Sequence, residues 1–175
     1  MHDELLQFQR NDVWTLVPRP EGELIIGTKW IFRNKTDEEG NVIRNKAWLI
    51  AQGYSQMEGV DYDETFALVA RMESIRIIFA LACQLKFKLY QMDVKTTFLN
   101  GLLKEDVYVT QPKWFIDPHF SDHVLYLKKA FYGLKQAPRV WYDLLTQYLV
   151  SYRFTRGKAY QTLFIKREDG ELIVA

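Results

Sequence analysis

The chain has one cysteine, Cys83, among its 175 residues, which excludes a disulfide framework and any zinc site built from cysteines. Cys83 lies in the apolar stretch 77–85, so we expect it to be a small buried core residue. No apolar run approaches the ~20 residues that a membrane span needs, and the acidic start, Met1 to Glu4, is not a signal peptide. These absences favour a reducing, intracellular compartment and no membrane partner.

Signatures of several enzyme classes are also missing. The sequence contains no Gly-rich phosphate loop, no GxSxG elbow and no dinucleotide-binding fingerprint. Its three histidines, His2, His119 and His123, lack the spacing of a helical metal site or a catalytic triad. Hydrolase and dinucleotide-dependent activities are therefore set aside.

Composition is that of a globular protein, with 48% hydrophobic and 26% charged residues. No repeat or linker divides the chain, so we expect a single domain over 1–175. The net charge is only +1, yet the segment 128–167 holds nine Lys and Arg residues against one acid, Asp143. Such a segment suggests a surface that faces a polyanion. A solvated face matched by acids elsewhere is the alternative, and charge alone leaves both open.

The first half of the chain predicts an irregular lead-in over 1–24, followed by a β-hairpin. Its strands are 25–34 and 42–51, joined by a polar turn that contains Gly40. Apolar residues at spacings of three and four predict a helix over 73–85, with one face made by Ile75, Ile78, Phe79, Ala82 and Leu85.

The middle of the chain predicts a strand over 87–92 that ends at Asp93. A helical turn over 94–99 should follow and stop at Asn100-Gly101 in a left-handed conformation. A carboxylate between a strand and a helical turn is well placed to hold Mg²⁺, although one carboxylate cannot complete a two-metal site. A polar strand end or helix cap is the alternative. Asp61, Asp63 and Glu64 are interpreted as a solvated approach to a helix.

The second half predicts strands over 107–111 and 124–128, then a helix that opens at Ala137-Pro138. A final hairpin should pair 162–166 with 171–174. The fold class is therefore α+β, with helices packed on one face of an antiparallel sheet.

Three motifs carry a family resemblance. They are Lys29-Trp-Ile-Phe-Arg-Asn-Lys35, Tyr90-Gln-Met-Asp-Val-Lys-Thr-Thr-Phe-Leu-Asn-Gly101 and Ala130-Phe-Tyr-Gly-Leu-Lys-Gln-Ala-Pro-Arg-Val-Trp-Tyr142. Together with the chain between them, from about Asn11 to Val174, they resemble the reverse transcriptase of copia-type LTR retrotransposons, a part of the Pol polyprotein.

The resemblance implies a right-hand polymerase with fingers, mostly over 25–70, and an incomplete palm over 71–175. It implies RNA-templated DNA synthesis with two Mg²⁺ or Mn²⁺ ions, and RNA/DNA template-primer and dNTP as partners. The remainder of the polymerase and an RNase H region would accompany this part of a longer polyprotein. An intact element would work in the cytoplasm, within a virus-like particle.

The resemblance also assigns site residues. Asp93 would be the first catalytic carboxylate and a metal ligand, with the backbone carbonyl of Val94 beside it. Phe98 would exclude a ribose 2′-hydroxyl, with plain core packing as the alternative. The nucleotide site would comprise Arg33, Lys35, Arg44, Lys46, Phe98, Gly133, Lys135, Gln136 and Pro138. The nucleic acid would contact Lys128, Lys129, Arg139, Arg156 and Lys158.

Several positions depart from the family pattern. Trp48 stands where the family usually has arginine, Leu68 replaces proline, Lys113-Trp114 replaces Pro-Gly and Tyr160 replaces aspartate. The sequence stops at Ala175, before the Tyr-x-Asp-Asp turn that supplies the other two carboxylates. We therefore expect a fragment that is inactive alone, from a decaying genomic copy.

Two other interpretations remain. One is a non-catalytic module that binds single-stranded nucleic acid through basic and aromatic residues. Residues 156–160 begin like an RNA-recognition signature, but the aromatic end of that signature is missing. The other is a transposon relic that neither folds stably nor acts, because an unpaired strand and exposed apolar faces favour aggregation.

Overall fold

The computed structural model describes residues 1–63, 65, 70–158, 160–168 and 170–175. The chain has a mixed α/β fold that divides into two compact units. Unit 1 comprises Met1–Phe66 and Thr96–Trp141, and unit 2 comprises Ala67–Lys95 and Tyr142–Ala175. Within the described ranges, no helix is long and apolar enough to cross a membrane.

Unit 1 is built on a four-stranded sheet with the order β1-β6-β5-β2. The strands are β1 (Trp14–Val17), β6 (Val124–Lys129), β5 (Leu102–Val109) and β2 (Ile25–Ile26). β6 pairs antiparallel with β1 and β5, whereas β2 runs parallel to β5. The predicted combination of helices and strands is confirmed. The strands of the described residues form three separate sheets, one of which contains a parallel pair, whereas one antiparallel sheet was expected.

The predicted irregular lead-in is also wrong, because residues 1–24 contain helix α1 (His2–Arg10) and strand β1. Phe8 is 1% exposed and stacks on Trp14, with ring centres 4.5 Å apart, while its edge meets Phe131. Phe8 is thus the buried anchor of this helix, and Met1 and Leu5 pack against the same core. Acids in its first turn and Arg10 in its last match the helix dipole, a signal that sequence analysis missed.

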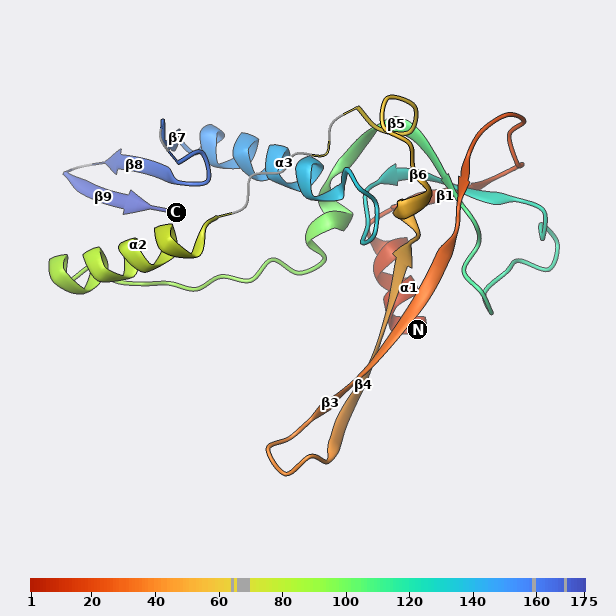
Figure 1. The fold of residues 1–175 in the computed structure, drawn as a ribbon, viewed down its shortest axis with the longest axis horizontal. Helices are drawn as coiled ribbons and strands as arrows, with labels where there is room; N and C mark the ends of the chain where they lie inside the picture. The colour runs from red at the N-terminus through yellow and green to blue at the C-terminus, as the bar shows by residue number, and fades with distance from the viewer. Residues whose placement is uncertain (64, 66–69, 159, 169) are drawn as a thin grey trace. The chain divides into compact units, whose positions relative to one another are not determined.

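The predicted hairpin is confirmed as β3 (Thr28–Thr36) and β4 (Val42–Ala51). At its base, Trp30 and Leu49 are buried. Beyond them the two strands extend away from the rest of unit 1 to an exposed tip (Figure 1). Asp37 closes the turn by accepting hydrogen bonds from the backbone and side chain of Asn41.

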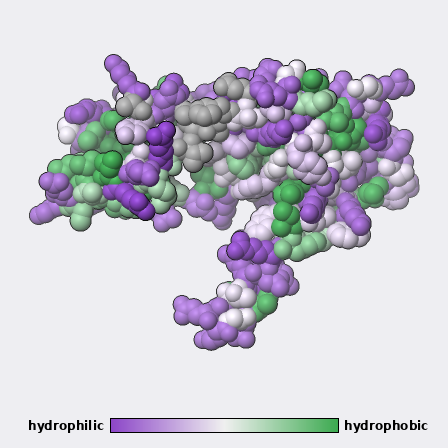
Figure 2. Space-filling view, in the orientation of Figure 1, coloured by the Kyte–Doolittle hydropathy of each residue, from purple (hydrophilic) through white to green (hydrophobic). Residues whose placement is uncertain are grey.

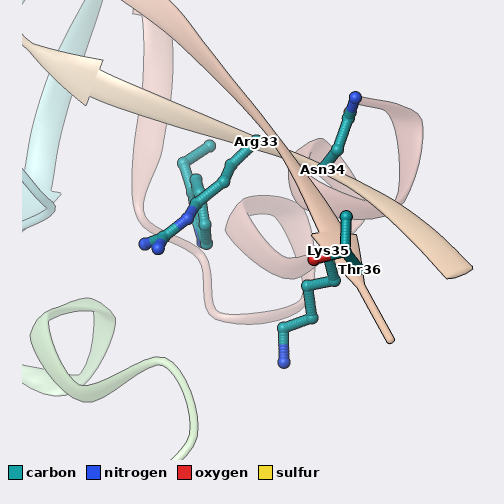
Figure 3. A pocket seen from close by; sticks show the side chains of 5 residues that line it. Arg33, Asn34, Lys35 and Thr36 are labelled. Carbon is teal, nitrogen blue, oxygen red and sulfur yellow. The ribbon is translucent and has the colours of Figure 1, made fainter. Parts of the chain in front are cut away.

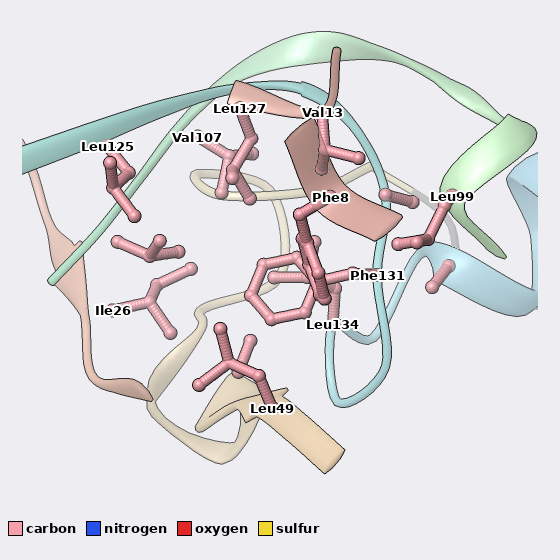
Figure 4. Close-up of a cluster of buried hydrophobic side chains, with 14 of the residues drawn as sticks. Phe8, Val13, Ile26, Leu49, Leu99, Val107, Leu125, Leu127, Phe131 and Leu134 are labelled. Atoms are coloured by element: carbon pink, nitrogen blue, oxygen red, sulfur yellow. The ribbon is translucent and has the colours of Figure 1, made fainter. Parts of the chain in front are cut away.

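The core of unit 1 joins segments far apart in the sequence. Phe8 and Phe131 lie at its centre, with residues from α1, β2, β4, β5 and β6 around them (Figure 4). The 3-10 helix η2 (Thr97–Asn100) adds Leu99. Here Thr96 is left-handed and Gly101 is extended, so the predicted left-handed stop at Asn100-Gly101 is wrong.

Unit 2 contains helix α2 (Met72–Leu85), most of helix α3 (Ala137–Ser151), and strands β7 (Thr155–Arg156), β8 (Phe164–Glu168) and β9 (Glu171–Val174). The predictions of both helices and of the final hairpin are confirmed, apart from Asp169, which lies outside the described residues.

The apolar face predicted for α2 is only partly covered. Ala82 is buried, whereas Phe79 and Leu85 are exposed, and apolar side chains show on the surface of this unit (Figure 2). Cys83 is exposed as well, which contradicts the expected core residue. One residue along a helix turns the side chain by about 100°, and that turn carries Cys83 away from the side on which Ala82 is buried.

The strand predicted over 87–92 is wrong, because this segment has no strand conformation and is exposed. Left-handed Lys86 ends α2, and the Phe87 amide donates to the Ala82 carbonyl. A strand needs a neighbour for its hydrogen bonds, and in the described part of unit 2 the strands pair among themselves as β7-β8-β9. β propensity alone therefore did not produce a strand.

We expect Phe8→Ala to lower the free energy of unfolding of unit 1 by about 3–5 kcal/mol, because it leaves a cavity among Trp14 and Phe131. Phe32→Ala, at an exposed position of β3, should cost less than about 1 kcal/mol. Urea denaturation measures both. Equal losses in the two variants would contradict the anchoring role of α1.

Candidate nucleic-acid interface

The four cations predicted for the hairpin lie on one face of it. Arg33 is directly opposite Lys46, and Lys35 is directly opposite Arg44. Residues opposite each other in an antiparallel pair, and residues two apart along a strand, share a face. Figure 3 shows Arg33 and Lys35 extending to one side of β3 and Asn34 to the other. Like charges directly opposite repel, so this face favours an anionic ligand.

Trp48 occupies the next position of the same face, opposite Ile31. The Lys46 ammonium lies 5.6 Å from the centre of the Trp48 ring. Trp48 also lines a cleft of about 430 Å³ with Arg33, Asn34, Lys35 and Thr36. The hairpin thus combines an aromatic ring with a row of cations, and its outer part is mostly hydrophilic (Figure 2).

An acid from α1 reaches the same hairpin. Burial raises the pKa of the Glu4 carboxyl, and the nearby backbone of Leu49 and charge of Lys46 partly offset that rise. Lys46 is half-buried, whereas Arg33, Lys35 and Arg44 are exposed. Three of the four cations are therefore exposed to a ligand, whereas the half-buried fourth, Lys46, lies near the Trp48 ring and interacts with the charge of Glu4.

The segment from Ala130 to Pro138 packs its backbone directly on the base of the hairpin. The Ala51 amide donates to the Tyr132 carbonyl (2.8 Å). Gly133 has a φ of 97°, and a Cβ there would meet the Ala51 backbone, with its nitrogen at 2.9 Å and its carbonyl carbon at 3.0 Å. Only glycine combines this backbone conformation with so close an approach.

Lys135 and Gln136 are tied to the 3-10 helix η1 (Gly53–Ser55) and the loop after it. Gln56 donates from Nε2 to Gln136 Oε1 (3.0 Å), and Gln56 Oε1 accepts from the Lys135 amide (3.0 Å). The Lys135 ammonium donates to the Gln56 carbonyl (2.9 Å) and to the Tyr62 hydroxyl (3.2 Å). The same ammonium lies 5.1 Å from the centre of the Tyr62 ring. The Lys135 head is thus restrained.

Gln136 is 1% exposed, and its Nε2 has no hydrogen-bond partner among the residues that the structure describes. The family motifs place Gln136 in the predicted nucleotide site, whereas Gln56 and Tyr62 lie outside those motifs. A solvated approach to a helix was expected at the acids 61–64, whereas Tyr62 between them is buried and Asp61 accepts from the Met57 amide (2.6 Å). Glu64 lies outside the described residues. The aromatic side chain of Tyr62 between these acids was the sequence feature that indicated a buried position.

Phe98 is partly buried and its ring meets that of Tyr132 edge-on, with centres 4.7 Å apart. Phe98 therefore contacts the residue that precedes Gly133. Pro138 is exposed in the first turn of α3. Within unit 1, the structure thus brings Phe98, Gly133, Lys135 and Gln136 together near the base of the hairpin.

The basic residues predicted to contact nucleic acid have different surroundings. Lys128 forms an ion pair with Asp12 (2.8 Å), and Lys129 donates to the Asn11 carbonyl (2.6 Å). Arg139 is half-buried in unit 1. Arg156 and Lys158 are exposed in unit 2, where Arg156 makes a long contact of 3.5 Å to the Tyr142 hydroxyl. The first two lysines thus also hold the N-terminal segment.

Asp93 and Val94 belong to unit 2, in the exposed segment that follows α2. Among the residues that the structure describes, no three His, Cys, Asp or Glu side chains gather as a metal-ligand group. A centre with two ions needs several carboxylates. Asp93 alone does not fit that requirement.

The sequence matches the family model described as reverse transcriptase (RNA-dependent DNA polymerase) over residues 11–175. The chain belongs to the reverse transcriptase family. It is 42% identical over 164 residues to each of two retrovirus-related Pol polyproteins of Arabidopsis thaliana, from transposons RE1 and RE2. It is 38% identical over 167 residues to the corresponding polyprotein from transposon TNT 1-94 of Nicotiana tabacum.

These matches cover 93–95% of the chain but only 11–13% of each relative. They confirm the resemblance to the Pol polyproteins of copia-type elements. No solved structure matches this reverse transcriptase sequence.

We expect Gly133→Ala to destabilise unit 1 by about 3 kcal/mol or more, because the left-handed strain and the collision with Ala51 add together. Gly40 also has a positive φ, but its surroundings are open, so Gly40→Ala should cost only about 1–2 kcal/mol. Chemical denaturation of the two variants compares them. A Gly133→Ala loss no larger than that of Gly40→Ala would contradict the close approach.

Proposed function

We propose that the chain supplies the fingers and part of the palm of a right-hand, RNA-directed DNA polymerase, which transfers a nucleotide from a dNTP to a primer 3′-hydroxyl. The observation that carries the proposal is the cationic face of the β3–β4 hairpin, with Arg33 opposite Lys46 and Lys35 opposite Arg44. Because the chain belongs to the reverse transcriptase family, we propose that this face binds the phosphates of dNTP and template.

The segment 130–138 would form the other side of the nucleotide site. Its contact with Ala51 fixes it to the base of the hairpin. The Nε2 of Gln136 has no hydrogen-bond partner in the described part of the chain. The opening turn of α3 follows it, where a helix N-terminus attracts anions. Phe98, held against Tyr132, would exclude a ribose 2′-hydroxyl by its bulk.

Asp93 would serve as one carboxylate ligand of the Mg²⁺ or Mn²⁺ ions that the family uses. The described residues supply no further cluster for such ions. We therefore propose that the other carboxylates come from elsewhere in a longer polyprotein, and that these 175 residues do not polymerise on their own. The rest of the polymerase and an RNase H region would be its partners there, in the cytoplasm of the host cell.

The cationic face can be tested with the chain as it is. Replacing Arg33, Lys35, Arg44 and Lys46 by Gln should weaken binding of an RNA/DNA template-primer and lower the slope of log K against log salt by about 3. The measurement is fluorescence anisotropy of a labelled template-primer over a series of salt concentrations.

The matched control makes the same charge change at exposed cations outside the hairpin, namely Arg10, Arg19, Lys88 and Lys104. It should change the slope by less than about 1. If the two quadruple variants lose affinity equally, net charge rather than the hairpin governs binding, and the proposed role of the fingers is wrong.

The role of Asp93 is tested in a longer polyprotein that polymerises. There, Asp93→Asn should lower primer extension on an RNA template by at least about 10³-fold, because it removes a charged metal ligand. Asp63→Asn, at an exposed carboxylate, should leave the rate within about twofold. Extension by Asp93→Asn at the parent rate would refute the ligand role. Template-dependent extension by the 175 residues alone would refute the proposal that the other carboxylates lie outside them.

A further inference from the structure

Trp48 is an aromatic ring on a face that is otherwise largely cationic. We infer that it stacks on an unpaired base of a single nucleic-acid strand whose phosphates lie along the hairpin cations. This inference rests on the proposed function, and adds to it the class of ligand that the hairpin face takes. Trp48 would be a binding residue at a position where the family usually has arginine.

The register places the ring at one end of a charged row. Ile31 and Trp48 form one cross-strand pair, Arg33 and Lys46 the next, and Lys35 and Arg44 the one after. Each step of two residues advances about 7 Å along the strands. A base stacked at Trp48 would therefore leave the following phosphates over two successive pairs of cations.

Packing of the core does not account for this indole. The buried side chains at the base of the hairpin are Trp30 and Leu49, and both lie on the face opposite to that of Trp48 because they are one residue out of register with it. Trp48 is half-buried, which leaves part of its surface free. The neighbouring Lys46 ammonium and the cleft along Arg33 and Lys35 mark it as part of the charged surface.

At the Trp48 end of this face, an unpaired strand fits better than a duplex or a free nucleotide. The bases of a duplex are stacked on one another, and exposing one costs energy. A nucleoside triphosphate usually arrives with Mg²⁺, which prefers carboxylate ligands. The positions of this face from 29 to 35 and from 44 to 50 carry Lys, Ile, Arg and Lys, and Arg, Lys, Trp and Ile, so the two strands supply no carboxylate to it. Glu4 of α1 is an acid near this face, and its charge interacts with that of Lys46.

The chain contains a matched control. Trp114 is 62% exposed, and the ammonium of Lys113 lies 5.2 Å from its ring centre, so it has the same kind of lysine-indole pair. It lies in the loop between β5 and β6, outside the cationic face of the β3–β4 hairpin. If any exposed indole beside a lysine bound nucleic acid, the two tryptophans would behave alike.

The experiment compares binding of a 12-residue oligothymidylate with binding of an abasic oligonucleotide of the same length, without Mg²⁺. Both carry the same phosphates, so their affinity ratio measures the contribution of the bases. We expect the parent chain to bind the oligothymidylate about tenfold more tightly. Trp48→Ala should bring the ratio close to 1 and keep the salt slope, whereas Trp114→Ala should keep the ratio near ten.

Two further variants separate stacking from bulk and from misfolding. Trp48→Phe keeps an aromatic ring. The logarithm of its affinity ratio should therefore be at least about half of that of the parent chain. Trp48→Leu should lose the preference as Trp48→Ala does, although it preserves an apolar side chain. Retention of the tenfold ratio by Trp48→Ala or Trp48→Leu overturns the inference.

A dTTP arm distinguishes the strand from a free nucleotide. We expect dTTP to bind at least about tenfold more weakly than the oligothymidylate, and a Trp48-dependent affinity equal to that of the strand would overturn the single-strand assignment. The quadruple Gln variant of the hairpin distinguishes failure of the stacking role from failure of the proposed function. If it loses binding while Trp48→Ala keeps the tenfold ratio, the proposed function stands and the stacking role fails. If it binds as tightly as the parent chain, both fail.

Discussion

The close contact between Gly133 and Ala51 is the constraint on which the rest of unit 1 depends. It brings the backbone of the segment 130–138 against the base of the hairpin, and no side chain larger than hydrogen fits there. Lys135 and Gln136 can reach Gln56 only because this approach is so short. The same segment also carries Phe131 into the core beside Phe8, so the stability of the unit and the shape of its candidate site share one contact.

Local patterns were enough to predict the elements whose residues carry their own signal. The β3–β4 hairpin has a polar turn between β-rich runs, and helices α2 and α3 have clear apolar periods. Helix α1 was missed because its one fully buried side chain, Phe8, has partners, Trp14 and Phe131, that are brought to it by tertiary folding. The segment 87–92 has a high β propensity but no neighbouring strand, so the propensity was not realised.

The candidate site was predictable in part for the same reason. The cations of the hairpin followed from the sequence, but their arrangement on one face required the register, which the sequence did not specify. Family motifs pointed to Gly133, Lys135 and Gln136, whereas Gln56 and Tyr62 lie about 75 residues earlier and meet Lys135 only through folding. Asp93 was identified by its motif, and the described residues add no group of ligands around it.

The opposed cations also affect the hairpin itself. Arg33 against Lys46 and Lys35 against Arg44 place like charges where cross-strand neighbours normally attract, and the strands beyond Trp30 and Leu49 have no core to hold them together. A polyanion that binds only the paired strands removes that repulsion, and by linkage it stabilises the hairpin on which it lies. Under the proposed function, a bound strand would therefore stabilise the outer part of the hairpin, and binding and the stability of the paired strands would be linked.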